Sequence, residues 1–567
     1  MHTTAFAEPL SSEATTTLEA SAARRGVAGA QQVSVAEPAL EEPPLVAAPN
    51  DDELYWYLGR QQRWVQVVSV ISFALAASSL VKFSLTSPWL YPLLIVLAIT
   101  VGGSFLSMIS GLNQRRFSKA SHVDLTDSWE RSTPTAVVPS VDVFLPSCGE
   151  DMAVLRNTFT HVARMQWRGT LTIWVLDDAD KREVEELAAD FGFEYRVRPD
   201  RGHMKKAGNL RAGYGQSNGD FIVIFDADFC PRADFLSHTI PYMDDPEVAI
   251  VQTPQFFDTK ESMNWLERTA GATQELFYRF VQPSRDRANA PICVGTCAVY
   301  RRAALQKAGG FAQIEHSEDV HTGIKLTTAG YVVRYVPIVV SRGLCPSDLA
   351  GFLNQQYRWC NGSMTLLASG QASRKPLSVR QRISFWSGFM YYISTALNVF
   401  FLHVPGVLMA VFFAAEVRAS NYIPFLAGMW MYFVVMPRIS KSRWRYEVLR
   451  TQMAYSFCHA LAIVHKLTGR TAGWVATGAV SKSSSLARSI SMVGIVTLSS
   501  TLLLSWGALF RDVAEYGWAE FWTMGLFLAA YSYLAVPLLA SFIQVRSGRM
   551  PRRRADVVVP APLPANA

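Results

Sequence analysis

The sequence predicts an α/β domain, with a parallel-type sheet and helices on both faces, inserted in an α-helical transmembrane domain of about six spans. Two observations lead to this fold class. Between residues 124 and 373, short apolar strands alternate with helical segments, as in a doubly wound parallel sheet. On both sides of this block lie charge-free runs of the length that a bilayer requires, about 20 apolar residues.

Six apolar runs are expected to span the membrane. They are Trp64–Val81, part of Phe83–Gln114, part of Ile383–Ala415, Ala419–Pro437, Ser489–Phe510 and Phe521–Val545. Lys and Arg residues follow the second, fourth and sixth runs, and the opposite loops carry little positive charge. The positive-inside rule therefore predicts an inner-membrane protein whose middle block and both termini are cytoplasmic. These flanks account for the net charge of +7, so no nucleic-acid partner is expected.

The chain divides into seven segments along this pattern. Residues 1–55 are rich in Ala, Glu, Pro, Thr and Val and predict a disordered tail. The other segments are two spans (60–112), the α/β domain (124–373), an interface helix with two spans (374–440), a cytoplasmic amphipathic helix with a candidate gating loop (441–488), two spans (489–545) and a basic, Pro-rich tail (546–567). All seven Cys fall on the cytoplasmic side and are expected to be reduced thiols.

The amphipathic helix is predicted from apolar residues at helical spacing beside polar ones. The apolar residues are Met453, Phe457, Leu461, Val464 and Leu467, and the polar ones are His459, His465 and Lys466. This pattern is typical of a helix that lies at a membrane interface. The segment after it, Gly473–Lys482, fits an ordinary Gly-containing loop, and a gating role for it is implied only by a family resemblance.

The stretch Phe221–Asp228, FIVIFDAD, is the centre of the predicted domain. Its apolar residues indicate a strand buried on both faces, and Asp226 and Asp228 follow at once. In an extended backbone both carboxylates point to the same side, beyond the strand end where open α/β sheets bind ligands. Two hard oxygen donors suit Mg²⁺ or Mn²⁺. Taken alone, the same residues also fit a strand that ends in an acidic turn.

Two further motifs are expected near this edge. The strand Leu171–Leu176 ends in Asp177 and Asp178, and strand-end acids are either turn formers or part of a nucleotide site. Lys205 and Lys206 lie in a Gly-rich connection, GHMKKAGNLRAG, which places cations and backbone N–H groups near a diphosphate or is simply solvated.

Two motifs follow in the second half of the domain. Glu318 and Asp319 precede the predicted helix Val320–Ala329, where acids cap a helix or act as a general base. Gln355, Arg358 and Trp359 have the i, i+3, i+4 spacing of one helical face. Anchoring at the membrane surface explains any one of these three, but less readily the set.

In order, the chain carries a strand-end Asp (Asp178), KAGN (Lys206–Asn209), DAD (Asp226–Asp228), ED (Glu318–Asp319) and QxxRW (Gln355–Trp359), with membrane spans on both sides. This series resembles the processive family 2 inverting glycosyltransferases. They comprise cellulose synthase and its relatives, among them curdlan and other β-glucan synthases, chitin synthase and hyaluronan synthase. The resemblance covers roughly residues 60–545 and implies a GT-A glycosyltransferase domain.

The resemblance also implies a role for each matching position. Asp319 is the expected general base, and Asp226 and Asp228 are the expected ligands of Mg²⁺ or Mn²⁺. Trp359 and Glu318 are expected to contact the acceptor sugar. The expected donor-binding residues are Asp177, Asp178, Lys206, Asn209, Asp226, Gln355 and Arg358.

The expected function is the polymerisation of a β-linked polysaccharide, a cellulose- or curdlan-like β-glucan, from UDP-glucose, with export through the enzyme's own transmembrane channel. Three alternatives stay open: a chitin- or hyaluronan-type synthase that uses UDP-N-acetylglucosamine, a non-processive transferase to a lipid, and a non-catalytic membrane scaffold or export subunit. Accessory export proteins or a homo-oligomer are conceivable partners. No cyclic-di-GMP-binding domain is expected, because about twenty residues follow the last span.

Overall fold

The computed structural model describes residues 46–548, except 59–61, 112–114, 116, 258, 261–262, 374–375, 402, 441, 443–444 and 471–483. Most of the two predicted tails, 1–55 and 546–567, lies outside the described residues, as does the candidate gating loop Gly473–Lys482.

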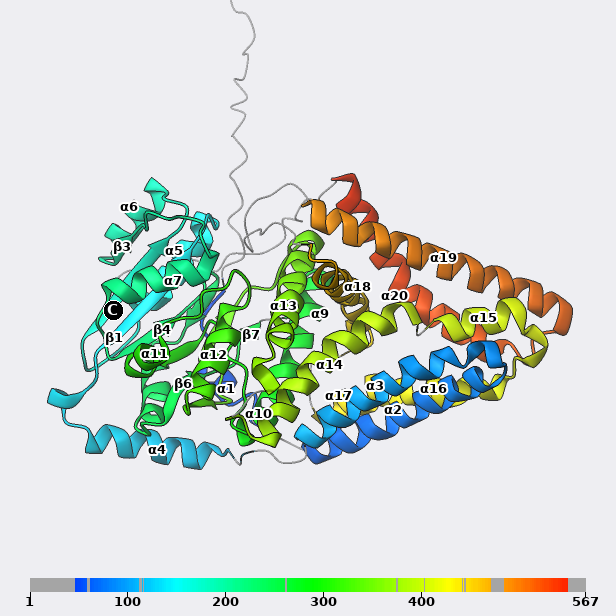
Figure 1. Cartoon of the computed structure of the whole chain (residues 1–567), viewed down its shortest axis with the longest axis horizontal. Helices are drawn as coiled ribbons and strands as arrows, with labels where there is room; N and C mark the ends of the chain where they lie inside the picture. Colours follow the sequence, from blue (N-terminus) through cyan, green and yellow to red (C-terminus); the bar gives the residue numbers. More distant parts are fainter. Residues whose placement is uncertain are drawn as a thin grey trace, which may run out of the picture. The chain divides into compact units, whose positions relative to one another are not determined.

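A seven-stranded sheet forms the centre of the α/β domain, with the strand order β3-β2-β1-β4-β8-β6-β9 (Figure 1). The strands are β1 (Val141–Ser147), β2 (Leu171–Asp177), β3 (Glu194–Arg196), β4 (Phe221–Ile224), β6 (Val248–Gln252), β8 (Ala298–Arg301) and β9 (Val332–Tyr335). All neighbours are parallel except β8, which is antiparallel to both β4 and β6. The predicted parallel-type sheet is therefore confirmed.

Helices cover both faces of this sheet, because successive residues of each buried strand point to opposite sides. Val143 of β1 packs into the cluster with α5, α6 and α8, whereas Phe144 packs into the cluster with α7, α11 and α12. The first set is α5 (Met152–Ala163), α6 (Arg182–Asp190) and α8 (Phe235–Thr239). The second set is α7 (Lys205–Gln216), α11 (Arg302–Ala308) and α12 (Glu318–Thr328).

A second, three-stranded sheet has the order β5-β10-β7 and follows the DAD stretch. Its strands are β5 (Phe229–Pro231), β7 (Phe256–Phe257) and β10 (Ser341–Gly343). The end of the predicted disordered tail is ordered against this region: helix α1 (Asp51–Leu54) pairs with it through Asp51–Arg232 and Glu53–Arg342. Burial of Leu54 in the core of the sheet domain and the Glu53–Arg342 ion pair hold residues for which composition predicted disorder.

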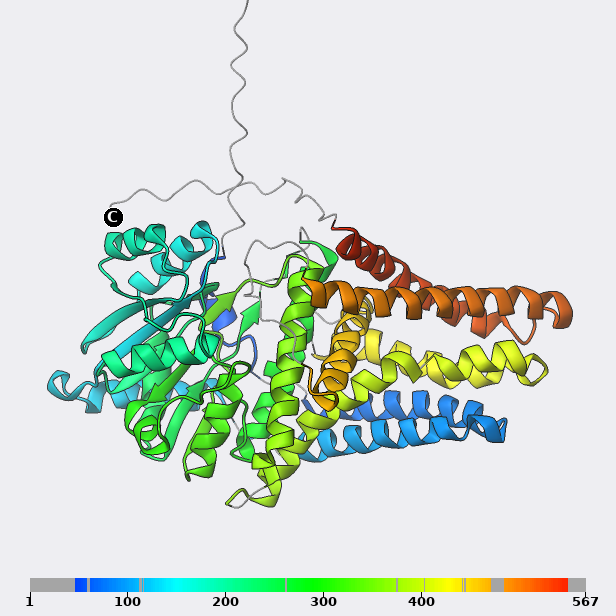
Figure 2. The ribbon, with the colours of Figure 1, turned by 45° about the horizontal axis from the view of Figure 1, so that its top comes forward.

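Within the described residues, five helical stretches are long and apolar enough to cross a membrane. They correspond to α2 (Gln62–Leu85), α14 (Val379–Phe401) with α15 (Val404–Phe412), α16 (Ala419–Trp430) with α17 (Met436–Ser440), α19 (Ser485–Tyr516) and α20 (Trp522–Ser547). The second predicted run, part of Phe83–Gln114, is also helical, as α3 (Pro92–Gly111), but its apolar part, Pro92–Ser107, is shorter. Helices α3 and α14 pack as a pair, as do α2 and α16. Helices α19 and α20 form a third pair, the orange and red helices of Figure 2.

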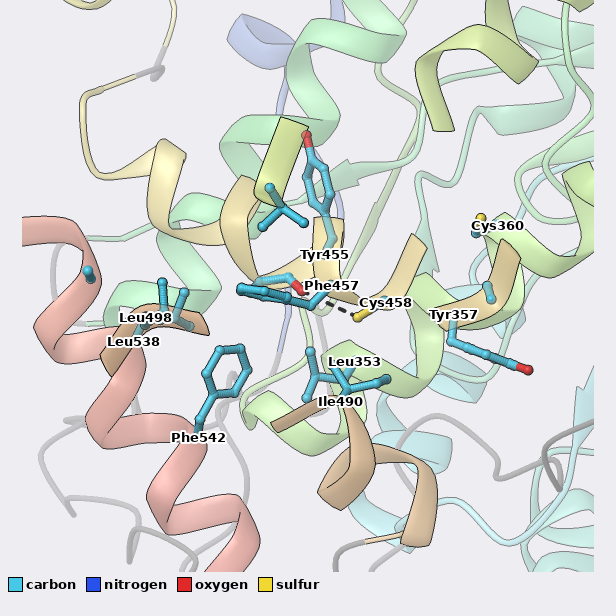
Figure 3. Packing of buried hydrophobic residues seen from close by; sticks show 14 of the residues in the cluster. Leu353, Tyr357, Cys360, Tyr455, Phe457, Cys458, Ile490, Leu498, Leu538 and Phe542 are labelled. Atoms are coloured by element: carbon cyan, nitrogen blue, oxygen red, sulfur yellow. Dashed lines mark hydrogen bonds between the residues drawn. The ribbon is translucent and has the colours of Figure 1, made fainter. Parts of the chain in front are cut away.

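Three helices connect the sheet domain to the membrane helices: α9 (Trp265–Leu276), α13 (Leu349–Ser369) and α18 (Val448–Leu467). Figures 1 and 2 both show α13 between the two parts. Leu353 and Tyr357 of α13 lie in one apolar cluster with Phe457 of α18 and with residues of α19 and α20 such as Ile490 and Phe542 (Figure 3). The sheet domain thus shares a core with the membrane helices.

A helix is present at the position of the predicted amphipathic helix, as α18, and it buries one of the polar residues. Leu467 is 82% exposed and Val464 51% exposed, whereas His459 is fully buried and its Nδ1 lies 2.8 Å from the Thr395 hydroxyl. The reason is that α18 packs on α9, α13 and α14. These helices bury a polar residue, which the apolar periodicity alone does not indicate. None of the seven Cys, all of which lie in the described residues, is paired in a disulfide.

Arg450 of α18 compensates a proline in the last membrane helix. Pro537 lies inside α20, so the carbonyl of Tyr533, four residues earlier, has no N–H donor within the helix. Arg450 supplies the donors: Nη2 lies 2.8 Å from the Tyr533 carbonyl and Nε lies 3.2 Å from the Leu534 carbonyl. The interface helix therefore completes the hydrogen bonding of α20 around its proline.

We expect Arg450→Ala to destabilise the folded protein by about 1–3 kcal/mol, the cost of leaving a buried polar group unsatisfied. In a Pro537→Ala background the same change should cost less, because alanine at that position restores the backbone N–H donor for the Tyr533 carbonyl. Thermal unfolding in detergent of the four proteins of this cycle measures the difference. Equal losses in both backgrounds would contradict the capping role.

Candidate active site

The acids of the DAD stretch lie at the carboxyl end of β4. Asp226 follows this strand, but the backbone turns at Ala227 and Asp228 instead of staying extended, and the Phe229 N–H donates to the Asp226 carbonyl at 3.0 Å. The prediction that an extended backbone aligns the two carboxylates was therefore wrong. The two carboxyl groups still interact: burial and the Asp226 carboxylate raise the pKa of Asp228 to about 7.

The predicted Gly-rich connection is a helix from Lys205 onward. Its glycines serve close packing: a Cβ on Gly208 would lie 2.2 Å from Nη1 of Arg198, and one on Gly213 would lie 2.7 Å from Cδ1 of Leu176. Composition favoured a loop, because glycine is a poor helix former, but tertiary packing against β2 overrides that preference.

Lys206 in the first turn of α7 reaches the acids. Its Nζ pairs with Oδ1 of Asp226, donates to the Gly295 carbonyl at 3.0 Å and lies 3.9 Å from Oε1 of Glu318. Asn209, one turn later, is buried and donates from Nδ2 to the Leu176 carbonyl at 2.7 Å. Asn209 thereby fastens α7 to the end of β2.

The two acids at the end of β2 are both engaged within the domain. Asp177 is fully buried and accepts hydrogen bonds from the Ser147 and Tyr195 hydroxyls and from the N–H groups of Ala179 and Lys181. Asp178 accepts two bonds from Arg198, at 2.6 and 2.8 Å, and one from the Gly202 N–H at 3.2 Å. Asp177 therefore stabilises the turn that follows β2. Asp178 fixes Arg198 and Gly202, which precede α7.

Two site residues had no signal strong enough to be found in the sequence. Arg198 is isolated after a short strand, yet its side chain is 1% exposed and binds Asp178. Glu150 lies in the turn after β1, where burial and nearby acids, Asp226 among them, raise its pKa. Parallel pairing of β1 with β4 predicts that their carboxyl ends share an edge, so a complete strand order would have identified Glu150.

Glu318 and Asp319 begin α12, and Lys206 and Asp226 act electrostatically on both carboxyl groups. Gly295, which has φ +76°, passes so close that a Cβ there would lie 2.9 Å from Cβ of Asp319. Burial, followed by the Glu318 carboxylate, raises the pKa of Asp319 well above its usual range. Burial also raises the pKa of Glu318, against the lowering effect of Lys206. The Glu318–Asp319 pair therefore tends to bind a proton or to be neutralised by a nearby cation.

Helix α13 meets α12 through a glycine. A Cβ on Gly362 would lie 1.9 Å from Oγ of Ser317, the left-handed residue (φ 56°) directly before α12. Gly362 shares a helical face with Gln355, Arg358 and Trp359, because these residues are spaced i, i+3, i+4 and i+7. The contact therefore presents the predicted QxxRW face to the acids.

Arg358 interacts electrostatically with Glu318 and Asp226. Burial lowers its pKa to about 10, and the Glu318 and Asp226 carboxylates oppose that lowering. Gln355 and Trp359 are half-buried on the same face. The structure thus brings Lys206, Asp226, Glu318, Asp319 and Arg358 to one place.

Asp226 and Asp228 supply two neighbouring carboxylates, a donor set that fits Mg²⁺ or Mn²⁺, which take one or two carboxylates and complete their shell with phosphate and water. The pKa of Asp228 is raised because two acids are close together in a buried place. A bound cation would remove this cause by neutralising their charge. The part of the chain that the structure describes holds no group of three or more His, Cys, Asp or Glu residues arranged for a metal.

Comparisons with known proteins agree with this geometry. Residues 221–439, which begin at β4 and continue into the membrane helices, match the family described as "Glycosyl transferase family group 2". The chain is 32% identical over 333 residues to "Cellulose synthase 1" of Komagataeibacter xylinus, covering 56% of this chain and 21% of that protein. It is 31% identical over 344 residues to "Cellulose synthase catalytic subunit [UDP-forming]" of Pseudomonas fluorescens (strain SBW25), covering 58% and 46%.

The chain resembles the processive family 2 glycosyltransferases of the cellulose synthase type. Its α/β domain has the GT-A fold. The chain spans less than half the length of these two relatives. Among solved structures, the mannosyltransferase PcManGT from Pyrobaculum calidifontis, in complex with GDP-Man and Mn²⁺, is 16% identical with a TM-score of 0.46, covering 66% of this chain and 99% of that chain.

Proposed function

We propose that the protein is a membrane-embedded, processive, inverting glycosyltransferase that polymerises a β-glucan from UDP-glucose. The single observation that carries the proposal is the meeting of Asp226, Asp319 and Arg358 at one sheet edge, beside a helix that shares its core with membrane helices. The description "UDP-forming" of the Pseudomonas relative supports uridine diphosphate as the leaving group.

The proposed reaction is one direct displacement at the anomeric carbon. Asp319, as carboxylate, takes the proton from the acceptor hydroxyl, whose oxygen attacks the anomeric carbon as the bond to the diphosphate breaks. Inversion follows because a single displacement reverses the configuration. Arg358 and Lys206 stabilise the negative charge that develops on the diphosphate. A divalent cation on Asp226 and Asp228 would supply Lewis-acid stabilisation of the same charge.

The other site residues take supporting roles in this proposal. Trp359 stacks on the acceptor sugar and Glu318 orients its hydroxyl, while Gln355 lies on the donor side of α13. Asp178 lines the nucleotide end of the site through its fixed pair with Arg198. Asp177 and Asn209 act on the donor indirectly, since their polar atoms are bonded to the domain itself.

The direct contact between α13 and the membrane helices supports export of the product. A polar polysaccharide does not cross lipid unaided, and a channel that begins beside Trp359 would accept each new unit. We propose the inner membrane as the location, with the GT-A domain and both termini cytoplasmic. We propose the seven segments predicted from the sequence as the parts of this arrangement, with helix α1 (Asp51–Leu54) at the end of the N-terminal tail.

The deciding test is synthesis by the purified protein in lipid vesicles with Mg²⁺ or Mn²⁺. UDP-glucose and UDP-N-acetylglucosamine are offered separately, released UDP is measured, and the product is digested with β-1,4- and β-1,3-specific glucanases. Polymer from UDP-glucose is the expected result. Polymer only from UDP-N-acetylglucosamine would favour a chitin- or hyaluronan-type synthase, and UDP release without polymer would refute processivity.

The pH dependence follows from the raised pKa of Asp319. A general base acts only when deprotonated, so kcat/KM should rise with pH between about pH 6 and pH 9. Glu318→Gln removes a carboxylate that raises this pKa, so it should move the rising limb to lower pH. A limb that stays in place would contradict the assignment of Asp319 as the base.

A further inference from the structure

Lys206 forms an ion pair with Asp226, one of the two carboxylates proposed to bind the metal. Its ammonium group pairs with Oδ1 of Asp226 and also contacts the Gly295 carbonyl (3.0 Å) and the Glu318 carboxylate (3.9 Å). These oxygens come from the end of β4, the loop before β8 and the start of α12. The ammonium therefore sits among three oxygens, in the manner of a bound cation.

The backbone that carries Lys206 is held in place by Arg198. Nη1 of Arg198 donates to the His203 carbonyl at 2.6 Å, and Nη2 donates to the Lys205 carbonyl at 3.2 Å. Met204 and Lys205 both have left-handed backbones, with φ of 52° and 50°. Such conformations are unfavourable for residues other than glycine and persist where their surroundings impose them. The entry to α7 is thus constrained so that Lys206 emerges toward Asp226.

Two cations compete for the Asp226 carboxylate. A divalent ion that binds Asp226 meets the ammonium of Lys206 at the same oxygens, and like charges at that distance repel. A nucleotide diphosphate changes the balance, because its oxygens are strong acceptors for a lysine ammonium. Once Lys206 turns to the diphosphate, Asp226 is open to the metal.

We propose that Lys206 is a placeholder cation, which neutralises Asp226 in the absence of donor and releases it when a nucleoside diphosphate binds. This inference rests on the proposed function and specifies how its metal and donor sites are coupled. Metal and nucleotide then bind cooperatively, and the coupling is reciprocal. The metal ion alone binds weakly.

The test measures Mn²⁺ binding to the purified full-length protein in detergent, by the electron paramagnetic resonance signal of free Mn²⁺, with and without UDP. Wild type should bind Mn²⁺ at least about fivefold more tightly with UDP than without it, the lower end of typical coupling between sites. Lys206→Met should bind Mn²⁺ more tightly than wild type without UDP, by about tenfold, and the gain on adding UDP should shrink. Lys206→Gln should act in the same direction.

Lys307→Met is the matched control, since it removes the same charge from an exposed site on α11, and it should leave Mn²⁺ affinity without UDP near the wild-type value. UDP-dependent Mn²⁺ binding in wild type, with no tightening in either Lys206 variant, would overturn the placeholder role alone. If wild type binds no Mn²⁺ even with UDP, and Asp226→Asn behaves as wild type, the metal–nucleotide site of the proposed function also fails.

Discussion

Asp319→Asn is expected to lower polymer synthesis by about 10²–10⁴-fold, the usual contribution of a positioned general base. Asparagine keeps the shape of the side chain beside Gly295 but cannot take a proton. Binding of UDP, measured by calorimetry, should change far less than turnover. Asp190→Asn, the same chemical change at an exposed site on α6, is the control and should keep full activity.

The same variant should not lose stability. The pKa of Asp319 is raised in the folded state, so the contribution of this carboxyl group is lost as pH rises from its unfolded pKa through the folded one. At about pH 8, Asp319→Asn should therefore unfold at the same temperature as wild type or a higher one. Full polymer synthesis by this variant would refute Asp319 as the base.

Arg358→Ala is expected to lower kcat/KM by about 10²–10³-fold, the size of effect seen when a group that stabilises transition-state charge is removed. Arg358 is half-buried and interacts electrostatically with the Glu318 and Asp226 carboxylates, so its loss also increases the repulsion between the acids and the diphosphate. Initial rates over a range of UDP-glucose concentrations measure the effect.

Two matched variants sharpen this prediction. Arg358→Lys keeps the charge but loses the planar fork of the guanidinium, so it should fall between alanine and wild type. Arg380→Ala removes an exposed arginine at the start of α14 and should have little effect. Equal rates for Arg358→Ala and wild type would exclude Arg358 from the reaction.

Much of the fold could be predicted because its signals are local. Buried strands such as Phe221–Ile224 stand out as continuous apolar runs, and the membrane helices stand out by length. The candidate acids could be predicted as a group, because the carboxyl ends of parallel strands share one edge of a sheet. The resemblance to family 2 glycosyltransferases rests on the same local motifs.

Other features depend on contacts between residues far apart in the chain. Lys206 lies on a helix because Gly208 and Gly213 pack against Arg198 and Leu176, a reason that composition does not contain. His459 is buried on what apolar periodicity predicts to be a polar position, because α18 is covered by other helices. Propensity and periodicity describe one segment at a time, so they are overruled wherever several segments meet.

Residue types and their order along the chain already establish the chemistry available to this protein: two strand-end acids, the Glu318–Asp319 pair, the QxxRW helix and the membrane segments. How these groups interact depends on the folded arrangement. The close approach of Gly362 to Ser317 turns Arg358 toward the acids, and the Arg198 contacts direct Lys206 to Asp226. The two kinds of information differ because residue types set charge and hydrogen-bonding capacity, whereas pairing depends on distances that only packing establishes.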